Sequence, residues 1–140
     1  MIAILDSSVA VKWYAREADS DIAEQLLSYS LGAPDFILAE VANALWKKVR
    51  KKEIVAAQAA GALPHLAASV TFLPSAPLVQ RALELAMDLG HPVYDCIFLA
   101  LAEDRDLPLI TSDERLVRQL EPATEGVELT LLRDWRSPNG

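Results

Sequence analysis

The chain of 140 residues has one cysteine, two histidines and five glycines, and these shortages exclude several classes of protein. The single Cys96 cannot form an internal disulfide, and no Cys/His spacing typical of a zinc site is present. No apolar stretch is long enough to span a bilayer, and no basic leader precedes an apolar run with a cleavage site. We therefore expect a soluble, cytoplasmic protein without a membrane-spanning segment.

Basic residues are also scarce, since 13 Lys and Arg face 20 Asp and Glu and give a formal net charge of −7. That balance alone disfavours a nucleic-acid partner, because affinity for the phosphate backbone comes mainly from Lys and Arg. The basic residues are unevenly spread, however, and many of them fall within positions 47–52. A local patch of this kind can bind nucleic acid whatever the net charge.

Apolar residues are abundant at 52%, and their spacing predicts alternating strands and helices. Short apolar runs predict strands at 1–5, 70–73, 107–111 and 127–132. The stretches between them predict helices at 8–15, 19–30, 35–52, 53–69, 77–89, 95–102 and 113–120. Asp35 is expected to cap its helix, and Gly61 and Pro64 are expected to kink helix 53–69 or divide it into two shorter helices.

This alternation predicts an α/β protein, a three-layer α/β/α sandwich with a central parallel sheet. We expect one domain over residues 1–140, with a frayed tail at 134–140. Asp6 and Asp113 each follow an apolar strand, so a parallel sheet would place both at the edge where ligands bind. Asp95 opens a helix that is apolar on all sides, and Glu40 lies beside Phe36 and Ile37 within the longest helix.

Each acid also has an ordinary structural interpretation. Asp6, Asp95 and Asp113 could cap helices, and Glu40 could be solvated. Taken together they are harder to explain, because no Lys or Arg lies in the apolar segments around Asp6, Glu40 or Asp95. Two carboxylates about 4 Å apart repel by about 4 kcal/mol at an effective dielectric near 20. A cation would relieve this repulsion, and oxygen ligands suit Mg²⁺ or Mn²⁺.

The chain also resembles PIN-domain ribonucleases, and its compact length is similar to that of VapC toxins. Four motifs carry the resemblance in family order and spacing: Asp6-Ser7-Ser8, Glu40 to Leu45, Tyr94-Asp95 and Thr111-Ser112-Asp113. The resemblance implies a PIN-like fold and a Mg²⁺-dependent endoribonuclease that hydrolyses RNA phosphodiester bonds. It further implies a homodimer, the toxin of a type II toxin–antitoxin pair, inhibited by a small VapB-type antitoxin.

The resemblance assigns roles to particular residues. The metal-binding and catalytic acids would be Asp6, Glu40, Asp95 and Asp113. Thr111 and Asn43 match supporting positions, and Ser7 is a further candidate for a hydrogen bond to a ligand. The chain departs from many relatives at Leu116, where an aromatic residue is common; we expect this to affect packing only.

Several other side chains have two interpretations. The candidates for contact with RNA are Lys12, Arg16, Lys47, Lys48 and Lys51, although a basic helix end also satisfies the helix dipole. Three aromatic residues, Trp13, Tyr14 and Trp46, could stack on bases but are more typical of core or interface packing. We expect neither His65 nor His91 to act as a ligand or a base.

Two rival functions remain open. An acid-pocket phosphotransfer module, either a receiver domain or an aspartate-nucleophile phosphatase, also places Asp at the ends of parallel strands. The phosphatase type needs a second Asp two residues after the first, where this chain has Ser8. The second rival is a non-catalytic PIN-like module that only binds a partner.

Overall fold

A computed structural model of the chain describes residues 1–121 and 126–139. Five parallel strands form one sheet in the order β3-β2-β1-β4-β5. The strands are β1 (Ala3–Leu5), β2 (Leu31–Pro34), β3 (Thr71–Leu73), β4 (Leu109–Thr111) and β5 (Leu129–Leu131). The chain moves outward through β1, β2 and β3 and then returns to the other side of β1. The direction of winding therefore reverses between β1 and β4.

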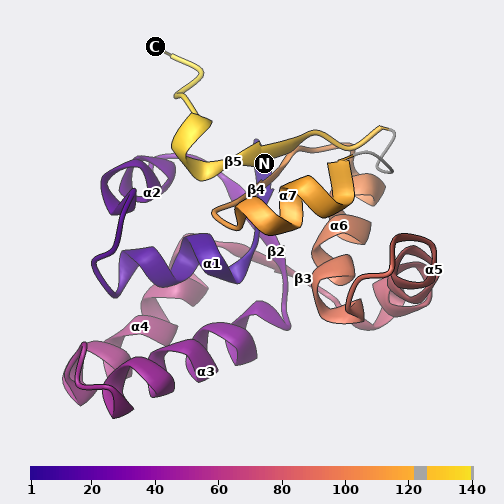
Figure 1. Ribbon diagram of the computed structural model, residues 1–140. Coiled ribbons are helices and arrows are strands. Elements are labelled where there is room, and N and C mark those ends of the chain that lie inside the picture. Colours follow the sequence, from indigo (N-terminus) through magenta and orange to yellow (C-terminus); the bar gives the residue numbers. More distant parts are fainter. Residues whose placement is uncertain (122–125, 140) are drawn as a thin grey trace.

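Helices cover both faces of this sheet. They are α1 (Ser7–Ala10), α2 (Ser20–Leu26), α3 (Ile37–Arg50), α4 (Ala56–Ser69), α5 (Val79–Leu89), α6 (Val93–Arg105) and α7 (Glu114–Leu120). Right-handed crossovers place α1–α4 on one face and α5–α7 on the other, because the winding reverses. Figure 1 shows α1 and α2 on one side of the strands and α5 and α6 on the other. The predicted three-layer α/β/α sandwich is confirmed.

The core is centred on β1 and α6. All residues of β1 are buried, and the residues of α6 from Cys96 to Ala102 are buried as well, as the apolar sequence predicts. Helix α5 ends at Gly90, whose φ of 64° is readily adopted by glycine. Over the described residues, no single helix is long and apolar enough to cross a membrane; 76–89 and 93–105 meet the criterion only as a bent pair.

Strand β2 is not among the predicted strands. It runs through Gly32 and Pro34, and both residues are unfavourable in strands. A Cβ at Gly32 would meet the sulfur of Met1, so the Met1 side chain lies directly over this glycine. Pro34 ends the strand, and the next residue, Asp35, donates its N–H to the carbonyl of Leu73 at 2.8 Å. The backbone hydrogen bonds between β2 and β3 therefore continue beyond Pro34, which has no N–H.

Further expectations differ from the structure. Asp35 does not cap α3, because its Oδ1 accepts hydrogen bonds from the amide and hydroxyl of Ser75. Helix α4 is not divided into two helices, and Pro64 lies inside it. The tail is not frayed at Trp135, which is only 9% exposed and packs edge-on against Tyr29. Gly140 lies outside the described residues.

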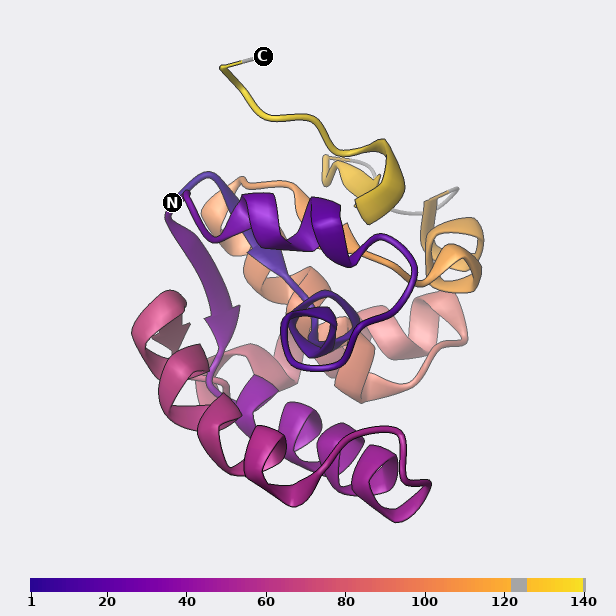
Figure 2. The same cartoon turned by 90° about the vertical axis from the view of Figure 1, so that its left-hand side faces the viewer.

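Figure 2 shows that α3 and α4 form a helical hairpin that projects from the sheet. The loop at 51–55 joins them, and the two helices pack against each other along their length. The first turn of α3 lies close to the carboxyl end of β2, and its last turn lies far out on the hairpin. This orientation places Glu40 beside the sheet and the basic residues at 47–52 at the outer end.

Candidate active site

The point where the winding reverses, between β1 and β4, is where open α/β sheets bind ligands. Asp6 directly follows β1, and its amide donates to the carbonyl of Ile110 in β4 at 3.2 Å. Asp113 follows β4 after a single serine. Parallel pairing of these neighbouring strands therefore brings the first and last of the four acids to the same edge of the sheet.

Asp6 is the most buried of these acids, at 8% exposure. Its Oδ2 accepts a hydrogen bond of 2.5 Å from the hydroxyl of Thr111, which is fully buried. Its Oδ1 accepts from the hydroxyl of Ser8 at 2.5 Å and from the Ser8 amide at 3.1 Å, which caps α1. Burial nevertheless raises the pKa of Asp6 to about 6, and the nearby charge of Asp95 adds to the increase.

Glu40 lies in the first turn of α3 and faces the same region. The hydroxyl of Ser7 donates to its Oε1 at 3.1 Å, which links α3 to the end of β1. Burial raises the pKa of Glu40 to about 7, and the charges of Asp95 and Asp6 raise it further. Asp6, Glu40 and Asp95 therefore lie close enough to affect one another electrostatically, although they are far apart in sequence.

Asp95 lies in the first turn of α6, whose N-cap is Pro92, so it does not itself cap the helix. Its Oδ2 lies 2.8 Å from Nε2 of His91, at hydrogen-bonding distance. His91 precedes the N-cap of α6 and lies outside the helix, so the spacing of four residues did not by itself predict this contact.

Asp113 is exposed, and its Oδ1 accepts a hydrogen bond from the amide of Leu116, so it caps α7. Asp113 and Asp95 line one cavity of about 320 Å³ together with His91 and Arg115. Arg115 was not among the predicted site residues. Within the described residues its guanidinium has no ion pair or hydrogen bond, and it lines the same cavity as this pair of acids.

Within residues 1–121 and 126–139, no basic side chain forms an ion pair with Asp6 or Glu40, and burial is the largest cause of their raised pKa values. A bound divalent cation would offset these two charges. No group of three or more His, Cys, Asp or Glu among these residues is gathered tightly enough to enclose an ion. Mg²⁺ does not require enclosure, since it keeps several waters and uses one or two carboxylates.

The three residues proposed as supporting ones lie near the acids. The Thr111 hydroxyl donates a hydrogen bond to Asp6 and accepts one from the backbone N–H of Asp113 at 3.1 Å. It therefore connects two of the acids. Ser7 bonds to Glu40. Asn43 is exposed and lines an open cavity of about 300 Å³ with Glu40.

The candidates for contact with RNA fall into two groups. Lys12 is buried, at 8% exposure, and donates to the carbonyl of Ala18, so it stabilises the local turn. Arg16 pairs with Asp21, and Lys48 pairs with Glu17. Two candidates form no ion pair within the described part of the chain, and they line a shallow cavity with Arg50: Lys47 and Lys51.

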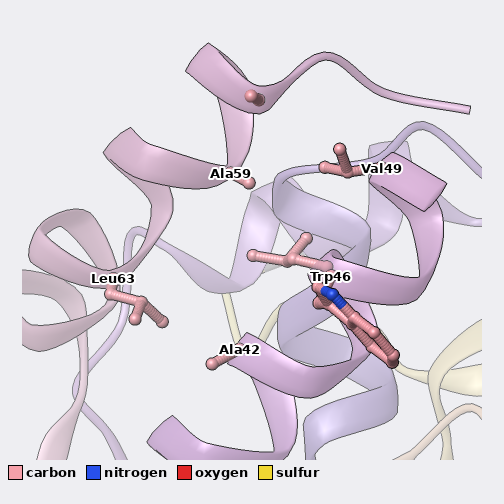
Figure 3. Close-up of a pocket in the computed structure, with 7 residues that line it drawn as sticks. Ala42, Trp46, Val49, Ala59 and Leu63 are labelled. Carbon is pink, nitrogen blue, oxygen red and sulfur yellow. The ribbon is translucent and has the colours of Figure 1, made fainter. Parts of the chain in front are cut away.

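An apolar groove of about 250 Å³ lies between α3 and α4. Figure 3 shows Ala42, Trp46 and Val49 of α3 facing Ala59 and Leu63 of α4. None of the lining residues carries an acid or a base, so this groove cannot perform the chemistry. Trp46 is 53% exposed here, and the guanidinium of Arg50 lies over its ring, 4.8 Å from the centroid.

Comparison with known proteins agrees with this geometry. Residues 3–120 match the family model described as PIN domain. The chain is 35% identical over 118 residues to ribonuclease VapC1 of Mycobacterium tuberculosis, covering 81% of this chain and 86% of that protein. The chain therefore belongs to the PIN-domain family. Within that family it is a VapC-type nuclease, which removes the receiver and phosphatase alternatives.

Solved structures extend the comparison to the fold. The crystal structure of PAE2754 from Pyrobaculum aerophilum matches with a TM-score of 0.72 at 23% identity, covering 92% of this chain and 89% of that one. A member of the VapBC family of toxin–antitoxin systems from M. tuberculosis, VapBC-5, matches with a TM-score of 0.59 at 25% identity. That match covers 93% of this chain and 98% of the other. The predicted PIN-like fold is confirmed.

Proposed function

We propose that this VapC-type nuclease is a Mg²⁺-dependent endoribonuclease that hydrolyses RNA phosphodiester bonds as the toxin of a type II toxin–antitoxin pair. The observation that carries the proposal is that Asp6, Glu40 and Asp95 act on one another electrostatically where the winding of the sheet reverses, while Asp6 and Glu40 have no basic partner among the described residues. Mn²⁺ is the alternative ion, because it also prefers oxygen ligands.

In this proposal the acids bind the ion, and two hydroxyl groups hold the acids in position. Asp6, Asp95, Asp113 and Glu40 would hold the ion, which when bound lowers the pKa of a water and neutralises charge on the phosphate. Thr111 keeps the Asp6 carboxylate oriented, because it donates to Oδ2 from a fully buried position. Ser7 fixes one oxygen of Glu40. Both hydroxyls therefore restrict the acids before substrate arrives.

The basic end of α3 gives the RNA backbone a path to the acids. Lys47 lies seven residues after Glu40, which places it on the same helix face about 10 Å along the axis. Lys51 continues that face at the end of the helix. A single strand that follows α3 outward from the acids would pass these two ammonium groups, which form no ion pairs within the described residues.

Two protein partners belong to the proposal. One is a second copy of the chain, as a homodimer, and the other is a VapB-type antitoxin. The structural match to a member of the VapBC toxin–antitoxin family supports the antitoxin. Co-expression with the product of a neighbouring reading frame, followed by co-purification and mass measurement, tests both associations. Normal growth of cells that make active protein alone would contradict the toxin role.

The endonuclease assignment is tested with circular single-stranded RNA, which has no end for an exonuclease to attack. We expect the wild type to linearise it in Mg²⁺ or Mn²⁺ but not in EDTA. The Asp6→Asn variant should be inactive in all three conditions. Linear RNA cut only from an end, with circular RNA intact, would show an exonuclease instead. RNA binding without cleavage in any metal would favour the non-catalytic alternative.

A further inference from the structure

Tyr94 presents an aromatic ring to solvent at the entrance to the acidic site. The residue is 64% exposed and directly precedes Asp95 in α6. Its ring stacks on that of Phe36, with centroids 5.7 Å apart and an interplanar angle of 21°. Phe36 in turn packs against Phe98, which is 1% exposed, at 5.9 Å. The outer ring is thus supported from the core by two others.

The stacked rings of Tyr94 and Phe36 lie next to Glu40, one of the proposed catalytic acids. Tyr94 and Phe36 line the open cavity of about 300 Å³ that also contains Glu40, Asn43 and Ala39. The cavity therefore has an aromatic wall, a carboxylate and an amide side chain. Within the described residues, no protein hydrogen bond involves the side chain of Asn43.

An isolated exposed tyrosine needs no explanation, since much of any protein surface is apolar. The position and support of Tyr94 distinguish it. Two acids lie near the ring, because Glu40 lines the same cavity and Asp95 is next in the chain, and Phe36 stacks on the ring while the residue stays largely exposed. A phosphodiester at these acids would bring an adjoining nucleobase within reach of the ring.

We propose that Tyr94 forms a stacking subsite for an unpaired base of the RNA substrate next to the cleaved bond, with Phe36 holding the ring in place. The inference rests on the proposed ribonuclease function. Single-stranded RNA is the fitting occupant, because its bases are unstacked and each has a π face. The side chain of Asn43 is placed to contact the edge of that base.

The test is a double-mutant cycle, which combines a substitution of Tyr94 with the removal of one base from the RNA. A single-stranded oligonucleotide that the wild type cuts at one mapped bond is made again with one abasic nucleotide at each position in turn. For the wild type, kcat/KM should fall about 5- to 150-fold at one position beside the cut, as expected for one stacked base. For Tyr94→Leu, kcat/KM on the intact RNA should fall by a similar factor, and the abasic substitution at that position should cost nothing more.

Two control variants separate stacking from other effects. Tyr94→Phe keeps the ring and should retain the wild-type abasic profile. Met87→Ala removes an exposed side chain of α5 that lines none of the cavities described, and it should change nothing. The RNA effect should appear mainly in KM, because a stacked base binds before the chemical step.

The outcomes are distinct. If the wild type cuts RNA but Tyr94→Leu shows the same abasic profile, the stacking subsite is wrong while the proposed function stands. If Tyr94→Leu keeps that profile and instead changes the mass of the protein in light scattering, the ring is a contact between copies and the inference is also wrong. If the wild type cuts no RNA with Mg²⁺ or Mn²⁺, the proposed function itself fails.

Discussion

The hydroxyl of Ser7 donates a hydrogen bond to Oε1 of Glu40 across a separation of 33 residues, at 3.1 Å. Ser7 begins α1 directly after Asp6, and Glu40 lies in the first turn of α3. One hydrogen bond therefore connects two of the four acid-bearing segments. A similar connection joins Asp6 to the segment of Asp113 through Thr111. Hydroxyl groups therefore link the segments of Asp6, Glu40 and Asp113, whereas Asp95 contacts His91.

Replacing Ser7 with Ala removes the bond that orients Glu40. We expect cleavage to fall about 10- to 100-fold, the usual cost of losing an outer-shell partner of a metal ligand. The fold should be unaffected, because Ser7 is only half-buried. Single-turnover cleavage of labelled RNA measures the effect. Ser112→Ala is the control, since the Ser112 hydroxyl has no hydrogen bond within the described residues; an equal loss in both variants would contradict the role of Ser7.

Replacing Thr111 with Val keeps the shape of a fully buried side chain and removes its hydroxyl. Asp6 then loses a hydrogen bond that lowers its pKa, so the pKa should rise further above about 6. We expect the lower limb of the pH–rate profile to move to higher pH and stability to fall by about 1–3 kcal/mol. Thr111→Ser should restore both. An unchanged profile in Thr111→Val would show that Thr111 does not tune Asp6.

The pKa of Glu40, about 7 in the folded protein, predicts a pH dependence of stability. Because the folded-state pKa is raised, the contribution of Glu40 is fully present below its ordinary value and is lost as the pH rises through about 7. In EDTA, Glu40→Gln should therefore melt a few degrees higher than the wild type above about pH 7 and match it below about pH 4.5.

Mg²⁺ should reverse that difference, because an ion stabilises the ionised carboxylates. Thermal melts with and without Mg²⁺ above about pH 7 provide the measurement. The wild type should gain stability from Mg²⁺, and Glu40→Gln should gain less. An equal gain in both proteins would place the ion away from Glu40.

The two basic residues without ion pairs, Lys47 and Lys51, should matter more for RNA than their ion-paired neighbour. Changing both to Ala should weaken binding of single-stranded RNA and lower the slope of log K against log salt by about 0.7 for each lost phosphate contact. Lys48→Ala is the control, because its ammonium lies 2.9 Å from Glu17. It should cost at most about 1 kcal/mol of stability. If Lys48→Ala weakened RNA binding as much as the loss of Lys47 and Lys51, the proposed role of these two residues would be wrong.

Much of the fold followed from periodicity in the sequence. The apolar runs at 1–5 and 107–111 correctly gave β1 and β4, and a parallel sheet then placed Asp6 and Asp113 at one edge. The unbroken apolar stretch 95–102 correctly gave a buried helix. Strand β2 was not predicted, because its pairing with β1 and β3 outweighs the low strand propensity of Gly32 and Pro34.

Other features depend on contacts that no local pattern contains. Asp35 accepts a hydrogen bond from Ser75, 40 residues away in sequence, and so it does not cap the helix that follows it. Lys12 looks like a surface cation in sequence but is held under the turn at Ala18. The stacked pair of Phe36 and Tyr94 joins α6 to the start of α3, and only the packing of helices against the sheet brings the two rings together.

The central claim is that Asp6, Glu40, Asp95 and Asp113 serve one divalent cation. The most direct measurement is a crystal structure grown with Mn²⁺, with anomalous scattering used to locate the ion. We expect a peak within about 2.0–2.3 Å of carboxylate oxygens of Asp6 and Asp95, with waters in the remaining positions. The same experiment on Asp6→Asn should give a weak peak or none. An ion bound elsewhere, or none at these carboxylates under conditions in which the protein cuts RNA, would contradict the account.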